Sequence, residues 1–309
     1  MLKNSGLKRN TLSIGQDFSK HKVLYAMMLP YFALFTLMII IPIIVTIVLS
    51  FTYYNMFQMP SFIGITNYAN LLIDDDVFFI SLKNTITFAI ITGPVSYFFC
   101  FFMAWFINEF NVKTRVLLTF VFYAPSLSSS VYFIWYFIFH GDAYGILNGV
   151  LMSSGVLTNP IQWLSDPRYM LIVLMFVQVW MSLGTGFLSF IAGFQSIDRS
   201  MYEAGAIDGI KNRFQELIHI TLPMVKPQMI FSAVMQIAAS FSVSQISMAL
   251  CGFPSTNYAA HTLVLHVTDY AMVRYEMGYA CAISVVLFVL TLLFKRGIDI
   301  SFKYVRSDD

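Results

Sequence analysis

Long apolar blocks dominate the pattern of this chain. Six of them alternate with polar segments, at about 24–50, 81–107, 116–139, 169–192, 228–250 and 277–294. A helix needs roughly 20 apolar residues to cross a hydrocarbon core about 30 Å thick, and the core of a soluble protein does not need blocks of that length. The pattern therefore predicts an all-α integral membrane protein with six transmembrane helices.

Composition supports this prediction and excludes several other classes of protein. The chain is 58% apolar and only 11% charged, whereas soluble domains carry about 25% charged residues. Its net charge of +2 makes nucleic acid an unexpected partner. The three cysteines, Cys100, Cys251 and Cys281, have no CxxC spacing, so neither a disulfide framework nor a metal site is expected.

Lysine and arginine are distributed unequally between the two sides of these spans. Cytoplasmic loops carry the excess of basic residues, which places both termini in the cytoplasm and requires an even number of spans. We expect cytoplasmic tails at 1–22 and 297–309, a membrane domain at 23–296, and a first span that acts as an uncleaved anchor. The side rich in basic residues holds Lys3, Lys8, Arg9, Lys20, Lys22, Lys113, Arg115, Arg199, Lys211, Arg213, Lys226, Lys295, Arg296, Lys303 and Arg306, and the other holds Lys83, Arg168 and Arg274.

Acidic residues add little to the predicted chemistry. The run Asp74 to Asp76 falls in an outer segment and is expected to be a solvated loop, not a calcium site, because like charges repel and stay hydrated. None of the spans carries Asp, Glu, Lys or Arg near its middle. Such residues mark proton relays and ion-coupled carriers, so an ion-driven pump is disfavoured.

A long polar segment, 193–227, separates the fourth and fifth spans. Ser200 and Glu203 have the spacing of a capping box, which predicts that a helix begins there. Ala204 to Ala206 would give it a face with little bulk that another protein can approach closely, and Gly209 would end it at positive φ. A second amphipathic turn from 213 to 220 follows, stopped by Pro223.

An ordinary connecting loop on the membrane surface would share these features, and the residues themselves decide between the two interpretations. Together they closely resemble the EAA loop of binding-protein-dependent importer permeases, in the sugar-transport branch that includes the larger maltose permease and the A-type glycerol-3-phosphate permease. Two departures are Gly205 in place of alanine and a spacer of ten residues, not nine, after Gly209. The matching residues are Glu203, Ala204, Gly205, Asp208, Gly209, Ile220, Leu222 and Pro223.

Weaker blocks extend the resemblance over nearly the whole chain, which implies the type I ABC importer permease fold. They are Phe62, Gly64, Asn67, Tyr68, Asn84, Thr85, Pro125, Gly145, Asn148, Trp163 to Pro167 and Met277 to Ala280. In that family two permease subunits form the pore, two ABC ATPase subunits lie beneath it, and an extracellular solute-binding protein delivers the substrate.

The resemblance also implies partners and a location. We expect a second homologous permease subunit in a heterodimer, two ATPase subunits and a binding protein, in the bacterial inner (cytoplasmic) membrane. The sequence has no G-x-x-x-x-G-K-[ST] phosphate loop. The chain is therefore expected to bind no cofactor and to carry no catalytic residue, with ATP and Mg²⁺ held by the ATPase subunits and the EAA helix seated on one of them.

Uncharged polar and aromatic residues in the spans are the candidates for a sugar pathway, since sugars offer hydroxyl groups and flat apolar faces. Gln178 and Gln245 are of most interest because a buried amide in lipid must find a partner. The alternative is helix-to-helix packing, worth about 0.6 kcal/mol for each residue, which we expect for Asn84 and Ser128 to Ser130. The candidates are Tyr136, His140, Gln178, Trp180, Ser182, Gln236, Ser240 and Gln245.

Two other functions stay open at this point. The same kind of transporter could carry another solute such as glycerol 3-phosphate or a peptide, although a phosphate calls for Arg or Lys in the pore. A membrane enzyme or assembly factor is the other alternative. It is disfavoured because His140, His261 and His266 fall in outer or connecting segments without an evident acidic partner.

Overall fold

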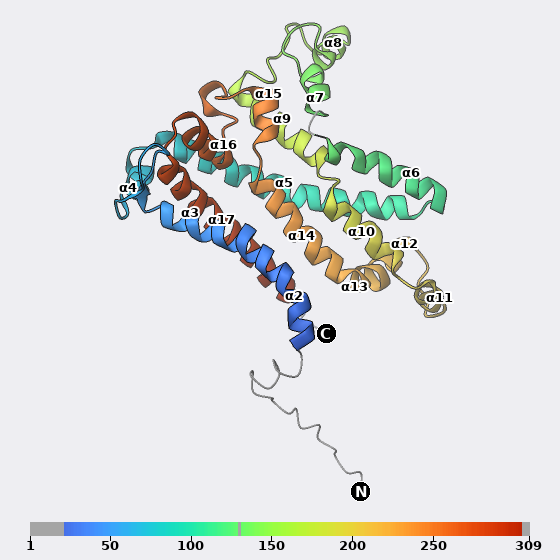
Figure 1. The fold of residues 1–309 in the computed structure, drawn as a ribbon. Helices are drawn as coiled ribbons and strands as arrows, with labels where there is room; N and C mark the ends of the chain where they lie inside the picture. Colours follow the sequence, from blue (N-terminus) through green and yellow to red (C-terminus); the bar gives the residue numbers. More distant parts are fainter. Residues whose placement is uncertain (1–21, 129–130, 305–309) are drawn as a thin grey trace.

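The computed structural model describes residues 22–128 and 131–304, and within these ranges the chain is a bundle of helices (Figure 1). The first span is continuous through α2 (Lys22–Phe35), the π-helix η1 (Thr36–Ile40) and α3 (Ile41–Leu49). A small antiparallel hairpin of β1 (Thr52–Tyr53) and β2 (Ser61–Phe62) precedes α4 (Thr66–Ile73). The predicted all-α membrane fold is confirmed.

Four helices among the described residues are long and apolar enough to span a membrane: Lys22–Leu49, Asp76–Asn108, Pro167–Gln195 and Met277–Ile300. Two bent pairs, Val112–Leu127 with Tyr132–Ile138 and Arg213–Met224 with Lys226–Phe241, raise the number to six if each pair is one span. The six predicted spans therefore agree with the structure only when broken helices are counted. The last helix, α17 (Met277–Tyr304), continues well beyond the predicted end at 294.

Only some of the predicted spans are single helices. α5 (Asp76–Asn108) is unbroken, but the third span divides into α6 (Val112–Tyr123), the 3₁₀ turn η2 (Ala124–Leu127) and α7 (Tyr132–Ile138). The fourth divides into α9 (Pro167–Met181) and α10 (Thr185–Gln195), and the fifth into α14 (Lys226–Phe241) and α15 (Gln245–Cys251). The predicted fifth span at about 228–250 thus consists of two helices. Of the residues for which packing between helices is expected, Ser129 and Ser130 lie outside the described residues.

Side chains from distant parts of the chain satisfy the carbonyl groups that these breaks release. At the break in the fourth span, the carbonyl of Ser182 accepts from Gln236 Nε2 at 3.1 Å and from Cys100 Sγ at 3.2 Å. At the break in the fifth, the carbonyl of Val243 accepts from Thr262 Oγ1 at 2.7 Å. An unsatisfied backbone group in hydrocarbon costs several kcal/mol, so these donors make the breaks tolerable.

α5 is the central helix of the bundle and packs on α9, α10 and α14. Its buried Cys100, Phe101 and Ala104 belong to one apolar cluster with Phe187 and Phe190 of α10. By contrast, α2 and α3 run beside α17 at the edge of the bundle (Figure 1) and bury no residue. That apolar outer face suits contact with lipid.

The remaining elements lie toward two ends of the bundle (Figure 1). One end, here called the loop end, carries α11 (Arg199–Ile207), α12 (Arg213–Glu216), the π-helix η4 (Leu217–Thr221) and α13 (Leu222–Met224). The opposite or far end carries α4, α8 (Ile146–Ser153), the 3₁₀ turn η5 (Thr256–Tyr258), α16 (Leu263–Thr268) and the π-helix η6 (Asp269–Val273).

A buried carboxylate holds the far end together, contrary to the solvated loop expected for the Asp74 to Asp76 run. Asp75 is only 8% exposed, and its Oδ2 lies 2.9 Å from His266 Nε2 while it accepts from Tyr279 at 2.9 Å and Tyr270 at 3.2 Å. Its Oδ1 caps α5 by accepting from the N–H of Phe78. The two neighbouring aspartates are exposed, as predicted.

The expectation that the histidines have no acidic partner is also wrong for two of them. His266 faces Asp75, and His140 Nδ1 lies 3.1 Å from Asp142 Oδ1. His261 stacks on Phe253, with 5.8 Å between the ring centroids. Among the described residues, no group of three His, Cys, Asp or Glu side chains is arranged to hold a metal ion.

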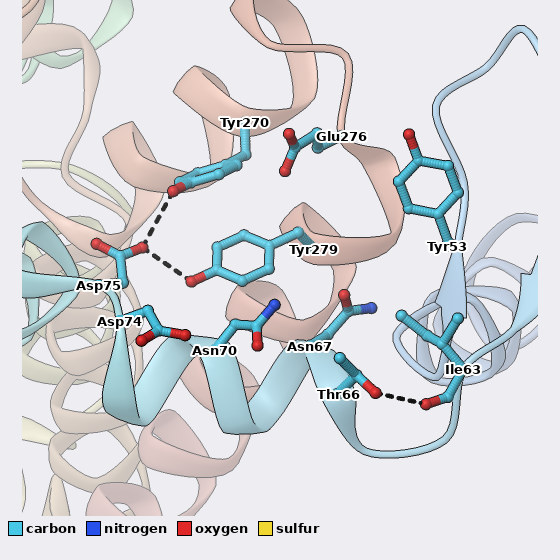
Figure 2. Close-up of a pocket in the computed structure, with 10 residues that line it drawn as sticks. All are labelled: Tyr53, Ile63, Thr66, Asn67, Asn70, Asp74, Asp75, Tyr270, Glu276 and Tyr279. Atoms are coloured by element: carbon cyan, nitrogen blue, oxygen red, sulfur yellow. Dashed lines mark hydrogen bonds between the residues drawn. The ribbon is translucent and has the colours of Figure 1, made fainter.

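Figure 2 shows a cavity of about 450 Å³ beside Asp75, between the β-hairpin, α4, η6 and α17. Tyr53 and Glu276 face it from one side and Asn67 and Asn70 from α4. Asn67 is held by hydrogen bonds from its Nδ2 to the carbonyls of Ser50 and Thr52. The lining is rich in carboxylates, amides and phenols, and none of its residues is Lys or Arg.

The contacts of Asn84 with the turn before α16 can be tested by mutation. Its Nδ2 donates to the carbonyls of Tyr258, Ala259 and His261 at 3.1, 3.2 and 2.9 Å, which is the packing role expected for it. Asn84→Ala should lower the free energy of unfolding by about 1–3 kcal/mol, because buried carbonyls lose their donor. Thermal unfolding of the purified protein in detergent measures the effect. Asn70→Ala, at an exposed position on α4, is the control, and equal losses in both variants would contradict the prediction.

The far end should also be sensitive to acid, since His261 and Asp75 lie there outside the spans. Burial, and secondly the charge of His266, lowers the pKa of His261 to about 4. Folding then disfavours the protonated ring, so the stability present above pH 6.5 falls as the pH drops toward 4. Burial raises the pKa of Asp75, but the hydrogen bonds from His266 and Phe78 outweigh it and bring that pKa to about 2. The stability that Asp75 contributes is therefore present above about pH 4 and is lost as the pH falls to 2.

We expect His261→Phe to remove part of the loss in stability between pH 7 and pH 5. Neither ring nitrogen of His261 has a hydrogen-bond partner in the described part of the chain, so a phenyl ring replaces it without breaking a bond. Thermal midpoints of the two proteins at both pH values give the comparison. An equal fall of the thermal midpoint between pH 7 and pH 5 in the variant and the wild type would contradict a contribution from His261.

Candidate functional site

The loop between α10 and α14 forms a small folded unit at the loop end. α11 begins two residues earlier than the capping box implied, because Asp198 is its N-cap and accepts from the N–H of Ser200 at 3.0 Å. Glu203 pairs with Arg199 at 3.6 Å instead of capping the helix. The predicted Ser200–Glu203 capping box is therefore wrong, although the helix that it predicted is present.

Gly209 ends α11 as predicted, with φ of +97°. This left-handed conformation strains residues that carry a Cβ. The N–H of Gly209 bonds to the carbonyl of Ala206 at 3.4 Å, and that of Ile210 to Gly205 at 3.0 Å. These two bonds satisfy carbonyl groups of the last turn.

Gly205 faces inward, not toward another protein as the sequence suggested. It is buried, and a Cβ added there would lie 2.6 Å from Ile220 Cδ1 and 3.1 Å from Ile210 Cδ1. Ile220 is itself 7% exposed. The small residue therefore lets α11 pack on η4, and its presence in place of alanine has a reason within the loop.

The surface that α11 presents outward is formed by its other motif residues. Glu203, Ala204 and Asp208 are exposed. Ile207 is 88% exposed, although it is a large apolar residue. We call Glu203, Ala204, Ile207 and Asp208 the α11 face.

The second half of the loop runs into the fifth span without the stop expected at Pro223. Asn212 caps α12 by accepting from the N–H of Gln215 at 2.8 Å. Helix then continues through η4 and α13, where Pro223 occupies the first turn and Leu222 packs against the core. The chain bends by 80° only at Val225, between α13 and α14.

Polar and apolar contacts fix this loop to the bundle. Arg213 pairs with Glu216 at 2.7 Å and with Glu109 at 3.3 Å, and Glu109 is the residue that ends α5. Tyr202 on α11 lies 3.0 Å from Thr221 Oγ1. Leu217 and Val225 join the apolar cluster of α5 and α10. These contacts connect the loop with the ends of α5 and α14.

Three of the eight residues proposed for a sugar pathway are buried in contacts between helices. Gln236 donates to the carbonyl of Ser182, which ends α9, and the Ser182 hydroxyl lies 3.7 Å from Cys100 Sγ of α5. The Ser240 hydroxyl donates to the Gln236 carbonyl within α14 and faces Gly93 of α5, where an added Cβ would lie 3.4 Å from it. Their placement gives them a role in packing. Packing was the alternative that the sequence left open for these residues, and the broken helix that needs the Gln236 donor is not visible in the hydropathy pattern.

The other five candidates are more open. Gln178 is half-buried on α9, and Gln245 is exposed as the first residue of α15. Trp180 packs edge-on against Trp135, with 5.1 Å between the ring centroids. Tyr136 and His140 line a cavity of about 460 Å³ at the far end, together with Asp142 and Gln162, which the sequence did not single out.

Comparison with known proteins identifies the family. Residues 98–307 match the family described as the inner membrane component of binding-protein-dependent transport systems. A probable ABC transporter permease, YesP of Bacillus subtilis (strain 168), is 32% identical over 284 residues, which cover 88% of this chain and 89% of that protein. The arabinooligosaccharides transport system permease AraP of the same organism is 28% identical over 278 residues, covering 89% and 87% of the two chains.

A solved structure shows the same fold. A chain of the bacterial alginate ABC transporter, in complex with its alginate pentasaccharide-bound periplasmic protein, superposes with a TM-score of 0.73 at 21% identity and covers 91% of this chain and 94% of its own. The overall fold of this chain is therefore one that a solved transporter chain also has. This chain belongs to the family of inner membrane components of binding-protein-dependent transport systems, as a permease subunit of an ABC importer.

Proposed function

We propose that the chain is one of two homologous permease subunits of an importer for a neutral sugar or oligosaccharide, with ATP hydrolysed by separate subunits. An extracellular binding protein delivers the sugar, the α11 face seats on an ATPase subunit, and closure of the ATPase pair moves the spans. ATP and Mg²⁺ are bound by those subunits, and this chain binds no cofactor.

The observation that carries this proposal is that the α11 face is exposed on a helix that packs on η4. Exposed apolar residues amid polar ones are typical of protein contact surfaces, and Ile207 is 88% exposed. Gly205 lets α11 pack on Ile220 of η4, and η4 leads through α13 into the fifth span. A partner that moves α11 therefore moves the bundle, which is what coupling requires.

A neutral cargo is favoured by the lining of the two far-end cavities. Asp74, Asp75 and Glu276 line one and Asp142 lines the other, and neither lining includes Lys or Arg. A phosphate or an acidic sugar calls for paired Arg or Lys donors, and carboxylates repel it. Glycerol 3-phosphate is therefore the weaker alternative. The related arabinooligosaccharide permease agrees with a neutral glycan.

The proposed orientation puts the loop end in the cytoplasm and the far end outside, with both termini cytoplasmic. We expect an impermeant maleimide to label Asp74→Cys in intact cells and to leave Asp208→Cys unlabelled, in a background where the three native cysteines are serine. Both positions are exposed in the structure. Labelling after permeabilisation is the control for reactivity. Protection of position 74 together with labelling of 208 would reverse the topology.

Ile207→Asp tests the α11 face. A charge at this exposed position should cost at least tenfold in ATPase subunits that co-purify and in sugar-dependent ATP hydrolysis, because an apolar contact is replaced by a desolvated carboxylate. The spans should keep their thermal midpoint, since Ile207 makes no buried contact. Transport is measured in liposomes with the binding protein, using labelled arabinotriose and maltose.

Val112→Asp is the matched control, because Val112 is 69% exposed on the first turn of α6, at the same end but outside the loop. It should leave ATPase co-purification unchanged. Normal co-purification and hydrolysis in Ile207→Asp would show that the α11 face is not the coupling surface.

A further inference from the structure

The cavity of about 460 Å³ at the far end has the form of a ligand site. It lies where the end of α7 and the segment that follows it meet α15, and its volume falls within the range of roughly 300–1,000 Å³ typical of small-molecule sites. Tyr136 and His140 come from the end of the third span. Asp142 and Gln162 come from the outer segment, and Met248 and Gly252 from α15 and its end.

The polar wall of this cavity is fixed by a buried amide behind it. Asn148 is fully buried, and its Nδ2 donates to the carbonyls of His140, Asp142 and Ile161 at 3.2, 3.1 and 2.9 Å. Its Oδ1 accepts from Trp163 Nε1 at 2.8 Å. A wall held in this way does not have to be ordered by the ligand, which favours binding.

Side chains of the wall combine an aromatic ring with hydrogen-bonding groups. Tyr136 is 38% exposed and packs edge-on against His140 at 5.3 Å. The Nδ1 of His140 lies 3.1 Å from Asp142 Oδ1, which turns Nε2 away from that contact. Gln162 donates through Nε2 to the carbonyl of Gly141 at 2.7 Å, so its Oε1 is left as an acceptor.

Within the described residues no hydrogen bond is formed by the Tyr136 hydroxyl, His140 Nε2, Asp142 Oδ2 or Gln162 Oε1. Donors and acceptors of this kind, uncharged except for one carboxylate, match the hydroxyl groups of a saccharide. Tyr136 and the 42% exposed Met248 offer apolar surface for the face of a sugar ring. The lining has no Lys or Arg that would select an anion.

α15 connects this cavity with the break in the fifth span. It begins at Gln245, directly after the non-helical residues 242–244, and ends at Cys251, which lines the cavity with Gly252. A ligand in the cavity therefore contacts the helix whose other end carries one of the pathway candidates.

We propose that this cavity is a receiving subsite for one unit of a neutral saccharide, occupied as the sugar leaves the binding protein and before it enters the spans. The inference rests on the proposed import of sugar and adds to it the place of transfer. Tyr136 and Gln162 contact the sugar, and Asn148 is a positioning residue that holds the wall.

Tyr136→Ala and Gln162→Ala test the subsite in reconstituted complexes with saturating binding protein. Each should lower uptake of labelled arabinotriose or maltose about five- to tenfold, as expected for a lost hydrogen bond or stacking contact. The affinity of the binding protein for the sugar should not change, and ATPase subunits should co-purify normally. Tyr144→Ala, at a 95% exposed tyrosine of the same outer segment, is the control and should transport normally.

A second measurement does not depend on turnover. Ser165→Cys, in a background where Cys100, Cys251 and Cys281 are serine, places a thiol in the cavity lining. Millimolar arabinotriose or maltose should slow its reaction with maleimide, whereas glycerol 3-phosphate should not. Wild-type uptake in both alanine variants, with no protection of the thiol, would overturn the subsite alone. Absence of uptake for every sugar by the wild-type complex would overturn the proposed function and this inference together.

Discussion

Every break in a membrane-spanning helix releases backbone groups that hydrocarbon cannot satisfy, and the architecture of this permease depends on how they are paired. The carbonyl of Ser182 is satisfied by Gln236 and Cys100, and that of Val243 by Thr262. Asn84 does the same for the turn before α16. Each donor comes from a different part of the chain, so the breaks hold the spans to one another as well as dividing them.

This requirement explains which features could be predicted from the sequence. Hydropathy locates all six apolar blocks, because the length of a span depends only on local composition. It does not show the breaks, since the donor for Ser182 lies 54 residues away on another helix and the partner of Asp75 lies 191 residues away. The sequence therefore suggested a pathway role for Gln236 and a solvated position for Asp75. The role of a polar side chain in a span depends on whether the backbone that faces it has an unpaired carbonyl group.

Some features of the loop between α10 and α14 could also be predicted from the sequence, and others could not. Gly209 could be predicted because positive φ is a local requirement that favours glycine. The direction in which Gly205 faces could not, because it depends on Ile220, which packs against it from η4. The capping error is smaller, since Asp198 and Ser200 are both good caps and only the first has the extended backbone that capping needs.

α5 is the element through which the two ends can act on each other. At the loop end its last turn meets Arg213, which belongs to the same folded unit as the α11 face. At the far end its cap, Asp75, is bound to His266, Tyr270 and Tyr279, so α16, η6 and α17 are tied to it. α5 is a single helix from Asp76 to Asn108, whereas the fourth and fifth spans beside it are interrupted. If α11 moves as the proposed coupling requires, we expect the relative motion of these spans to be taken up at their breaks.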